Sequence, residues 1–194
     1  MILGYCGTHR SGKTTLAKAM ADRLGLPFVG TSVSKCFADL GLHPANVNNA
    51  IDRQRVQDHI LITLEDQWNE HSDFVTDRTP LDLMAYTLTS GHLLVDDQWL
   101  EDYMELCGQL MRKFHVIGYV PPGLPIVEAE LKAALTQVSI RQVAFLIRGL
   151  LDTYTNTESR FIIPSLNIYH SLERRINYSL ASIDSYRQAI NEKI

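Results

Sequence analysis

A glycine-rich stretch near the start of the chain constrains the fold most strongly. Residues Gly7–Thr14 read G-T-H-R-S-G-K-T, which fits the phosphate-binding pattern G-x-x-x-x-G-K-[ST] without a mismatch. In such a loop the backbone N–H groups converge on a phosphate, the lysine contacts β- and γ-oxygens, and the last hydroxyl ligates Mg²⁺. Gly7 and Gly12 are required because the backbone turns tightly and a Cβ would keep the phosphate away. The sequence therefore predicts a nucleotide-phosphate site.

The residues on either side of this loop have the pattern that its mechanism requires. Residues 2–6 are short and mostly apolar, as expected for a buried strand that leads into the loop. After the loop, Leu16, Met20 and Leu24 recur every four residues, and Gly25 ends this helical run. The dipole of a helix that begins here adds to anion binding. We therefore expect a strand, the loop and a helix in direct succession.

We expect the whole loop to contribute to nucleotide binding. The candidate cofactor-binding residues are Gly7, Thr8, His9, Arg10, Ser11, Gly12, Lys13, Thr14 and Thr15. For His9 and Arg10 the backbone amides matter more than the side chains, which we expect to project outward. Thr14 is also a candidate Mg²⁺ ligand, so ATP and Mg²⁺ are the expected cofactors.

The composition indicates a globular protein and narrows the classes of partner. The 194 residues suit one domain, and 45% hydrophobic and 21% charged residues are ordinary proportions. No apolar run of membrane-spanning length and no leader-like start is present, so we expect no membrane partner. A net charge of −4 argues against broad nucleic-acid binding but is compatible with a local basic groove. Cys6, Cys36 and Cys107 lack metal-ligand spacing and indicate buried thiols in a reducing cytoplasm.

Candidate strands alternate with candidate helices along the chain. The strands are 2–6, 27–29, 74–77, 115–120 and 161–164; the later helices are 51–70, one from Pro80, 100–111, 127–135, 140–151 and 171–190. This alternation predicts an α/β fold, with a parallel sheet of about five strands and helices on both faces. No repeat or linker-like composition interrupts the pattern, so we expect residues 1–194 to form a single domain.

Asp77 ends the third candidate strand and is the second anchor of the predicted site. Ligands of parallel sheets bind at the carboxyl ends of the strands, so Asp77 and the loop should face one cleft. The Asp77 carboxylate would hold Mg²⁺ or accept a proton from the attacking hydroxyl, and the Arg78 guanidinium would hold a phosphate oxygen. The alternative is that Asp77 caps the helix from Pro80 and Arg78 is a solvated charge, although Thr79 is the nearer cap.

Gly7–Thr14 and residues 77–82 (D-R-T-P-L-D) together resemble the thymidylate kinase-like and deoxynucleoside kinase-like group of P-loop kinases. In those families an acid–arginine pair ends the third strand beside the acceptor. The form G-x-x-x-S-G-K-T-T followed by D-R-T looks most like kinases of bacterial viruses, including nucleotide kinases and 5-hydroxymethyluracil DNA kinases. The resemblance implies the three-layer P-loop nucleotide-kinase fold and, for a viral protein, the host cytoplasm. Related kinases are often homodimers, although the sequence itself does not indicate an oligomeric state.

One departure from that group changes an expected role. The stretch 30–35 after the second strand lacks the carboxylate that acts as base in better-known nucleoside kinases, so that role moves to Asp77. Pro164 and Ser165 follow the last strand, where the resemblance places the adenine ring.

Arginines outside the two motifs are weaker candidates. The lid-like segment at about 120–148 offers only Lys132, Arg141 and Arg148. Arg141 and Arg148 lie seven apart on one predicted helix and so point the same way, which suits two contacts to ATP oxygens; two solvated arginines explain the spacing equally well. Arg53, like Arg78, is a candidate for contacting the acceptor, while nearby acids make a surface ion pair an equal explanation for Arg53.

These observations favour an ATP-dependent phosphotransferase in which Lys13, Asp77 and Arg78 are the catalytic residues. The expected acceptor is a hydroxyl or phosphate of a nucleoside, a deoxynucleoside monophosphate or a modified base. The acidic balance favours a free small molecule, whereas the viral resemblance favours hydroxymethylated DNA.

Two other classes are a GTP switch and a non-kinase P-loop ATPase. Residues Asp22–Gly25 match Asp-x-x-Gly by letter but lie inside the first predicted helix, and Asn-Lys-x-Asp is absent. An ATPase that drives motion or transport usually needs a longer chain and a further signature loop. ATP hydrolysis that ignores every nucleoside and DNA acceptor would favour that class.

Overall fold

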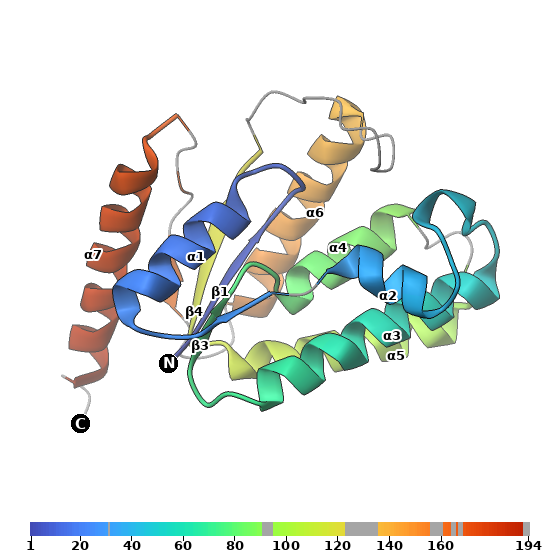
Figure 1. The fold of residues 1–194 in the computed structure, drawn as a ribbon, viewed down its shortest axis with the longest axis horizontal. Helices are drawn as coiled ribbons and strands as arrows, with labels where there is room; N and C mark the ends of the chain where they lie inside the picture. Colours follow the sequence, from blue (N-terminus) through green and yellow to red (C-terminus); the bar gives the residue numbers. More distant parts are fainter. Residues whose placement is uncertain are drawn as a thin grey trace.

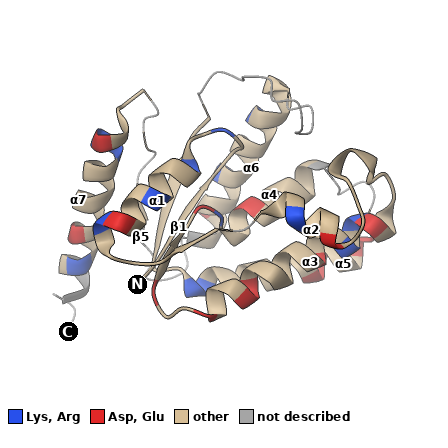
Figure 2. Ribbon diagram, in the orientation of Figure 1, with Lys and Arg blue, Asp and Glu red and all other residues tan. Residues whose placement is uncertain are grey.

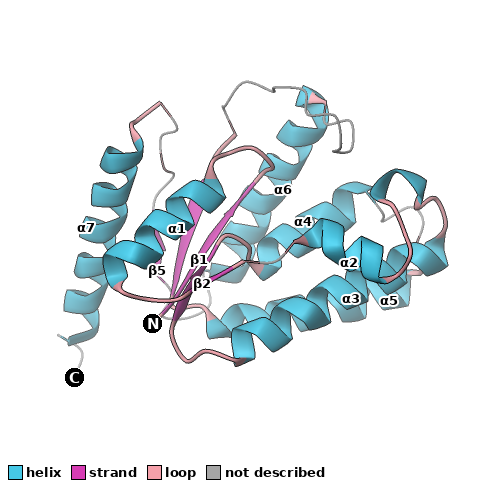
Figure 3. Ribbon diagram, in the orientation of Figure 1, coloured by secondary structure: helices cyan, strands magenta, loops and turns pink. Residues whose placement is uncertain are grey.

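Strands and helices alternate along the chain as the sequence predicts (Figure 3). The computed structural model describes residues 1–30, 32–90, 95–122, 136–155, 161–163, 166 and 169–191. The strands are β1 (Ile2–Gly7), β2 (Phe28–Val29), β3 (Phe74–Thr76), β4 (Val116–Val120) and β5 (Phe161–Ile163). The helices are α1 (Lys13–Leu24), α2 (Val33–Asp39), α3 (Ala50–Asn69), α4 (Pro80–Ser90), α5 (Asp97–Leu110), α6 (Gln137–Thr155) and α7 (Leu172–Asn191), with 3₁₀ turns η1 (Pro44–Asn46) and η2 (Met111–Lys113).

The five strands form one parallel sheet in the order β2-β3-β1-β4-β5. The central strand β1 therefore has β3 and β4 as neighbours. Gly4 pairs with Thr76 of β3, and Gly7 pairs with Val120 of β4. Because the strands are parallel, the loop after β1 and Asp77 after β3 both lie at the carboxyl ends of the strands, on the same side of the sheet. The predicted α/β fold is confirmed.

Helices cover both faces of this sheet (Figure 1). Helices α1 and α7 pack together on one face, while α4 and α6 lie on the other with α3 and α5 beside α4. The alternation of β1 explains the two layers: Leu3 and Tyr5 join the core under α1 and α7, whereas Ile2 and Cys6 join the core under α4 and α6. Among the described helices, none is both long enough and apolar enough to cross a bilayer.

The sequence analysis missed helix α2. This helix has only seven residues, and its first turn is capped by Ser32, whose Oγ accepts a hydrogen bond from the Lys35 N–H at 3.3 Å. Cys36 and Phe37 bury its inner face. The predicted helix at 127–135, Lys132 and much of the lid-like segment, and Pro164 and Ser165 lie outside the described residues.

The cysteines are buried, as the sequence predicts. Cys6 lies in β1, Cys36 in α2 and Cys107 in α5, and all three are free thiols. Burial raises the pKa of each thiol above its ordinary value.

Candidate active site

The phosphate loop between β1 and α1 has the backbone conformation that its glycines allow. Gly7 has φ 150° and Gly12 has φ 84°, both outside the range of ordinary side-chain-bearing residues. A Cβ on Gly7 would lie 2.2 Å from the Val120 carbonyl oxygen of the neighbouring strand. Arg10 also adopts a positive φ, of 58°, at the turn of the loop. The loop therefore bends sharply against β4 and enters α1 at Lys13.

We predict that Gly7→Ala lowers the free energy of unfolding by about 3 kcal/mol, because the methyl group meets backbone that cannot move aside cheaply. Urea unfolding followed by circular dichroism measures this. Gly149→Ala in α6 is the matched control, since its added Cβ meets nothing within 4 Å; it should change stability by no more than about 1 kcal/mol. Equal stability of the Gly7→Ala variant and the wild type would contradict the described loop geometry.

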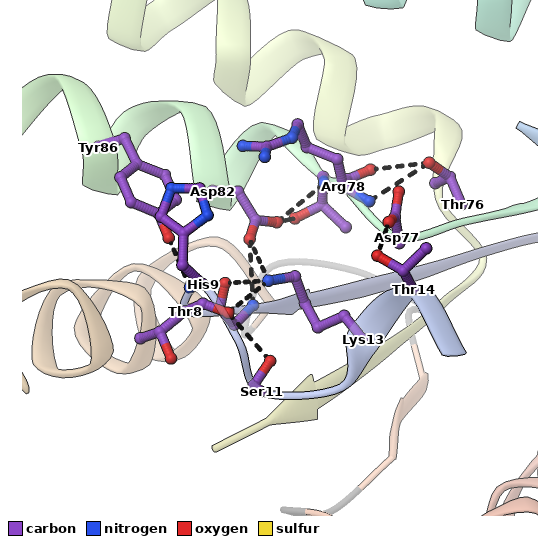
Figure 4. Close-up of polar contacts among 12 residues, drawn as sticks. Thr8, His9, Ser11, Lys13, Thr14, Thr76, Asp77, Arg78, Asp82 and Tyr86 are labelled. Carbon is purple, nitrogen blue, oxygen red and sulfur yellow. Dashed lines mark hydrogen bonds and ion pairs between the residues drawn. The ribbon is translucent and has the colours of Figure 1, made fainter. Parts of the chain in front are cut away.

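Lys13 turns back over the loop rather than out to solvent. Its Nζ donates hydrogen bonds to the carbonyl oxygens of Gly7 at 2.6 Å and Thr8 at 2.7 Å, and lies 3.9 Å from Oδ1 of Asp82 (Figure 4). Ser11 Oγ donates to the Thr8 carbonyl at 3.0 Å, which closes the loop on itself. Burial lowers the pKa of the Lys13 amine, and the Asp82 carboxylate counteracts this shift.

The structure brings Thr14 and Asp77 together, although they are 63 positions apart in the sequence. The Thr14 hydroxyl, in the first turn of α1, donates a hydrogen bond to Oδ2 of Asp77 (Figure 4). Asp77 therefore points toward the phosphate loop. The start of α4 is instead capped by Thr79 and Asp82: the Thr79 N–H donates to Oδ2 of Asp82 at 2.9 Å. Asp82, and not Asp77, therefore accepts the hydrogen bond at the start of α4.

Arg78 lies beside the same loop and is half-buried. Its backbone N–H donates to Thr76 Oγ1, and the same hydroxyl donates back to the Arg78 carbonyl, both at 3.3 Å. Its guanidinium lies 5.8 Å from the centre of the Tyr86 ring. The positive charge of Arg78 also acts on two buried neighbours: burial lowers the pKa of Lys13 and Arg78 adds to this shift, whereas burial raises the pKa of Asp82 and Arg78 opposes it. Arg78 is therefore more than a remote surface charge. We refer below to the side chains gathered at the phosphate loop as the cluster; they are Lys13, Thr14, Asp77, Arg78, Asp82 and Tyr86.

The remaining sequence candidates, Arg53, Arg141 and Arg148, lie on α3 and α6, outside the β1–α1 and β3–α4 connections that carry this cluster. Arg53 at the start of α3 donates to the Val47 carbonyl at 3.2 Å, and burial lowers its pKa. Arg141 and Arg148 are exposed on α6, as in the solvated alternative. Burial raises the pKa of the Tyr119 phenol in β4, and the charge of Arg148 opposes this shift. The role of these three arginines stays a prediction.

Two residues of the cluster were missed by the sequence analysis. Asp82 is completely buried, and burial raises the pKa of its carboxyl, although Lys13 and Arg78 act in the opposite direction. The Tyr86 hydroxyl accepts a hydrogen bond from the backbone N–H of His9 at 2.8 Å. A signal for Asp82 was present, since an acid in an otherwise apolar helical run calls for a buried partner. Tyr86 gave no such signal.

Comparison with known proteins agrees with this architecture. A family model described as ATPase family associated with various cellular activities (AAA) matches residues 3–67, which is less than half of the chain. These residues run from β1 through the phosphate loop to the last turn of α3. No sequence among the curated proteins matches the chain.

Solved kinase structures share the fold over almost the entire chain. A deoxyadenosine kinase from M. mycoides, with dCMP and dCDP bound, has a TM-score of 0.69 at 13% identity and covers 95% of this chain and 99% of its own. A thymidylate kinase from Candida albicans has a TM-score of 0.64 at 14% identity, covering 96% and 92%. A thymidylate kinase from Ehrlichia chaffeensis has a TM-score of 0.59 at 12% identity, covering 95% and 98%. The five-stranded parallel sheet with its surrounding helices is the fold of these P-loop kinases.

Proposed function

We propose that this protein transfers the γ-phosphate of ATP to a nucleoside or nucleotide acceptor. The observation that carries the proposal is the Thr14–Asp77 hydrogen bond, which joins the phosphate loop to the acid after β3. The fold shared with deoxyadenosine and thymidylate kinases supports the same reaction class. Asp22 and Arg23 lie within α1 and Gly25 ends that helix, so this stretch is no switch loop of a GTPase.

The residues present fit a magnesium-bound triphosphate. Oxygen ligands are those that Mg²⁺ prefers, and the Thr14 hydroxyl and Asp77 carboxylate supply two oxygens at one point. The N–H groups of the first turn of α1 have no partner within the helix, and they lie at its positive end. Bound Mg²⁺ would neutralise charge on the phosphates and hold them in a fixed orientation.

Each residue of the cluster then has a specific task. Lys13, which now donates to loop carbonyls, would donate to phosphate oxygens and neutralise their charge. Asp77 would hold the metal together with Thr14, or accept the proton from the acceptor hydroxyl. Arg78, whose guanidinium lies over an aromatic ring, would hold a phosphate oxygen of the acceptor or of the transferred group.

A small acceptor fits the charge distribution better than a DNA duplex does. Lys and Arg are scattered over several described helices, including α1, α3, α6 and α7, and are mixed with acids (Figure 2). Several are paired with those acids: Arg23 with Glu173, Arg55 with Asp52, Lys113 with Glu65, and Arg187 with Asp184. Binding a phosphate backbone needs unpaired basic side chains along one face. We therefore propose a free nucleoside or nucleoside monophosphate as acceptor, with hydroxymethylated DNA as the alternative.

A single labelling experiment tests these proposals. The protein is incubated with Mg²⁺ and γ-labelled ATP together with deoxynucleosides, deoxynucleoside monophosphates, or DNA with and without 5-hydroxymethyluracil. We expect label on a free nucleoside or nucleotide. Label only on modified DNA, with activity that falls steeply as salt is added, would favour the DNA kinase alternative. ATP hydrolysis without label on any acceptor would overturn the kinase proposal in favour of a P-loop ATPase.

A further inference from the structure

Two backbone N–H groups of the phosphate loop are occupied by side chains of helix α4. The Gly7 N–H donates to Oδ1 of Asp82 at 3.1 Å. The His9 N–H donates to the hydroxyl of Tyr86 at 2.8 Å. Asp82 and Tyr86 are four residues apart, so both project from the same face of α4 (Figure 4). Helix α4 therefore holds the loop at two points that are two residues apart.

The first of these contacts is rigid, because both oxygens of the Asp82 carboxylate accept hydrogen bonds. Oδ1 accepts from Gly7 and lies 3.9 Å from Lys13 Nζ, while Oδ2 accepts from the N–H of Thr79 at 2.9 Å and from its hydroxyl at 3.0 Å. The side chain is fully buried. A buried carboxylate held from both sides is fixed in orientation, since any rotation would leave a polar group unpaired. The position of the Gly7 N–H is thereby tied to the start of α4.

The second contact connects the loop with the arginine that follows the candidate catalytic acid. The Tyr86 ring lies 4.7 Å from the His9 ring, centre to centre, and 5.8 Å from the Arg78 guanidinium. The Tyr86 side chain thus contacts two parts of the proposed site. Its hydroxyl contacts the loop that would bind ATP, and its ring contacts Arg78, which would face the molecule that receives the phosphate. Arg78 is only two residues before the first residue of α4.

We propose that Asp82 and Tyr86 are positioning residues that hold Gly7–His9 in place, so that the N–H groups of the rest of the loop and of the first turn of α1 meet the triphosphate in a preformed arrangement. The inference rests on the proposed nucleotide binding. A loop that must be ordered on binding loses affinity for its ligand, whereas a preformed one does not. Because α4 contacts both the loop and Arg78, these contacts would also set the distance between the bound ATP and the molecule that receives its phosphate.

Tyr86→Phe is the sharpest test, because it removes the acceptor of the His9 N–H and leaves the ring against His9 and Arg78. We expect Mg·ATP to bind about fivefold more weakly in a calorimetric titration, which requires no acceptor. With the acceptor found in the labelling experiment, KM for ATP should rise by a similar factor while kcat at saturating ATP stays within about twofold. A variant that was merely less well folded would lose kcat, through its active fraction, and keep its KM.

Tyr5→Phe is the matched control for the loss of a buried hydroxyl. Tyr5 is fully buried in β1, two residues before Gly7, and belongs to the core under α1 and α7. Its variant should bind Mg·ATP as the wild type does. Equal affinities of Tyr86→Phe and the wild type, or equal losses in Tyr86→Phe and Tyr5→Phe, would overturn the inference.

Asp82→Asn should have the larger effect, a loss in Mg·ATP affinity of at least about tenfold. Both oxygens of Asp82 accept hydrogen bonds, so the asparagine NH₂ must face the N–H of either Gly7 or Thr79. If this variant does not fold, Tyr86→Phe still decides the question. Wild-type protein that does not bind Mg·ATP would overturn the proposed function itself. Binding by the wild type with unchanged Tyr86→Phe affinity would overturn only the positioning roles.

Discussion

A Lys13→Ala variant is expected to transfer phosphate at least about 10³-fold more slowly than the wild type. The Lys13 ammonium is held at the phosphate loop by hydrogen bonds to the carbonyl oxygens of Gly7 and Thr8. Its removal leaves the negative charge that develops on the transferred group without its nearest cation. Single-turnover transfer from labelled ATP measures the loss. Lys18→Ala is the control, since Lys18 is exposed on α1 with its ammonium over the Phe28 ring, and should retain full transfer.

The same substitution should also reduce stability, by about 3 kcal/mol of unfolding free energy. Asp82 is fully buried 3.9 Å from Lys13 Nζ, so the alanine leaves its carboxylate without that cation. Urea unfolding followed by circular dichroism measures this loss. Near-wild-type transfer by Lys13→Ala would contradict the assignment of this lysine to the reaction.

Asp77→Asn is expected to lower kcat by about 10²–10⁴-fold while the protein still folds. The amide keeps the size of the carboxylate and can still accept the Thr14 hydrogen bond, but it carries no charge to hold a metal or accept a proton. Circular dichroism checks the fold, and single-turnover transfer checks the chemistry. Asp73→Asn is the matched control, because Asp73 precedes β3 at the opposite end of the strand, where it pairs with the N-terminal amine. Turnover of Asp77→Asn close to that of Asp73→Asn would exclude a catalytic role.

The parts of the fold that are determined by residues close together in the sequence could be predicted from it. The loop and α1 follow from the spacing of Gly7, Gly12 and Lys13, and β3 follows from a short apolar run that ends on Asp77. These features are local, so a pattern of a few residues contains the physical cause. Helix α2 was missed because its signal is a single serine cap and two buried side chains.

The support of the loop could not be predicted, because it depends on contacts between distant segments. The hydrogen bond from the Gly7 N–H to Asp82 spans 75 positions, and that from the His9 N–H to Tyr86 spans 77. These contacts exist only when β1 and β3 lie side by side, and strand order is a property of the whole sheet. The spacing of Arg141 and Arg148 likewise indicates a shared helix face, but it does not say what that face meets.

The three buried thiols allow local unfolding of this protein to be measured by cysteine alkylation. An alkylating reagent reacts with a solvent-exposed thiolate. Burial shields each of these sulfurs from solvent and also raises the pKa of its thiol, so the folded protein should react slowly. Cys6, Cys36 and Cys107 sit in the central strand, in the short α2 and in α5, which are separate elements of the fold. The alkylation rate of each cysteine, followed by mass spectrometry, therefore measures how often its own element detaches from the rest of the protein.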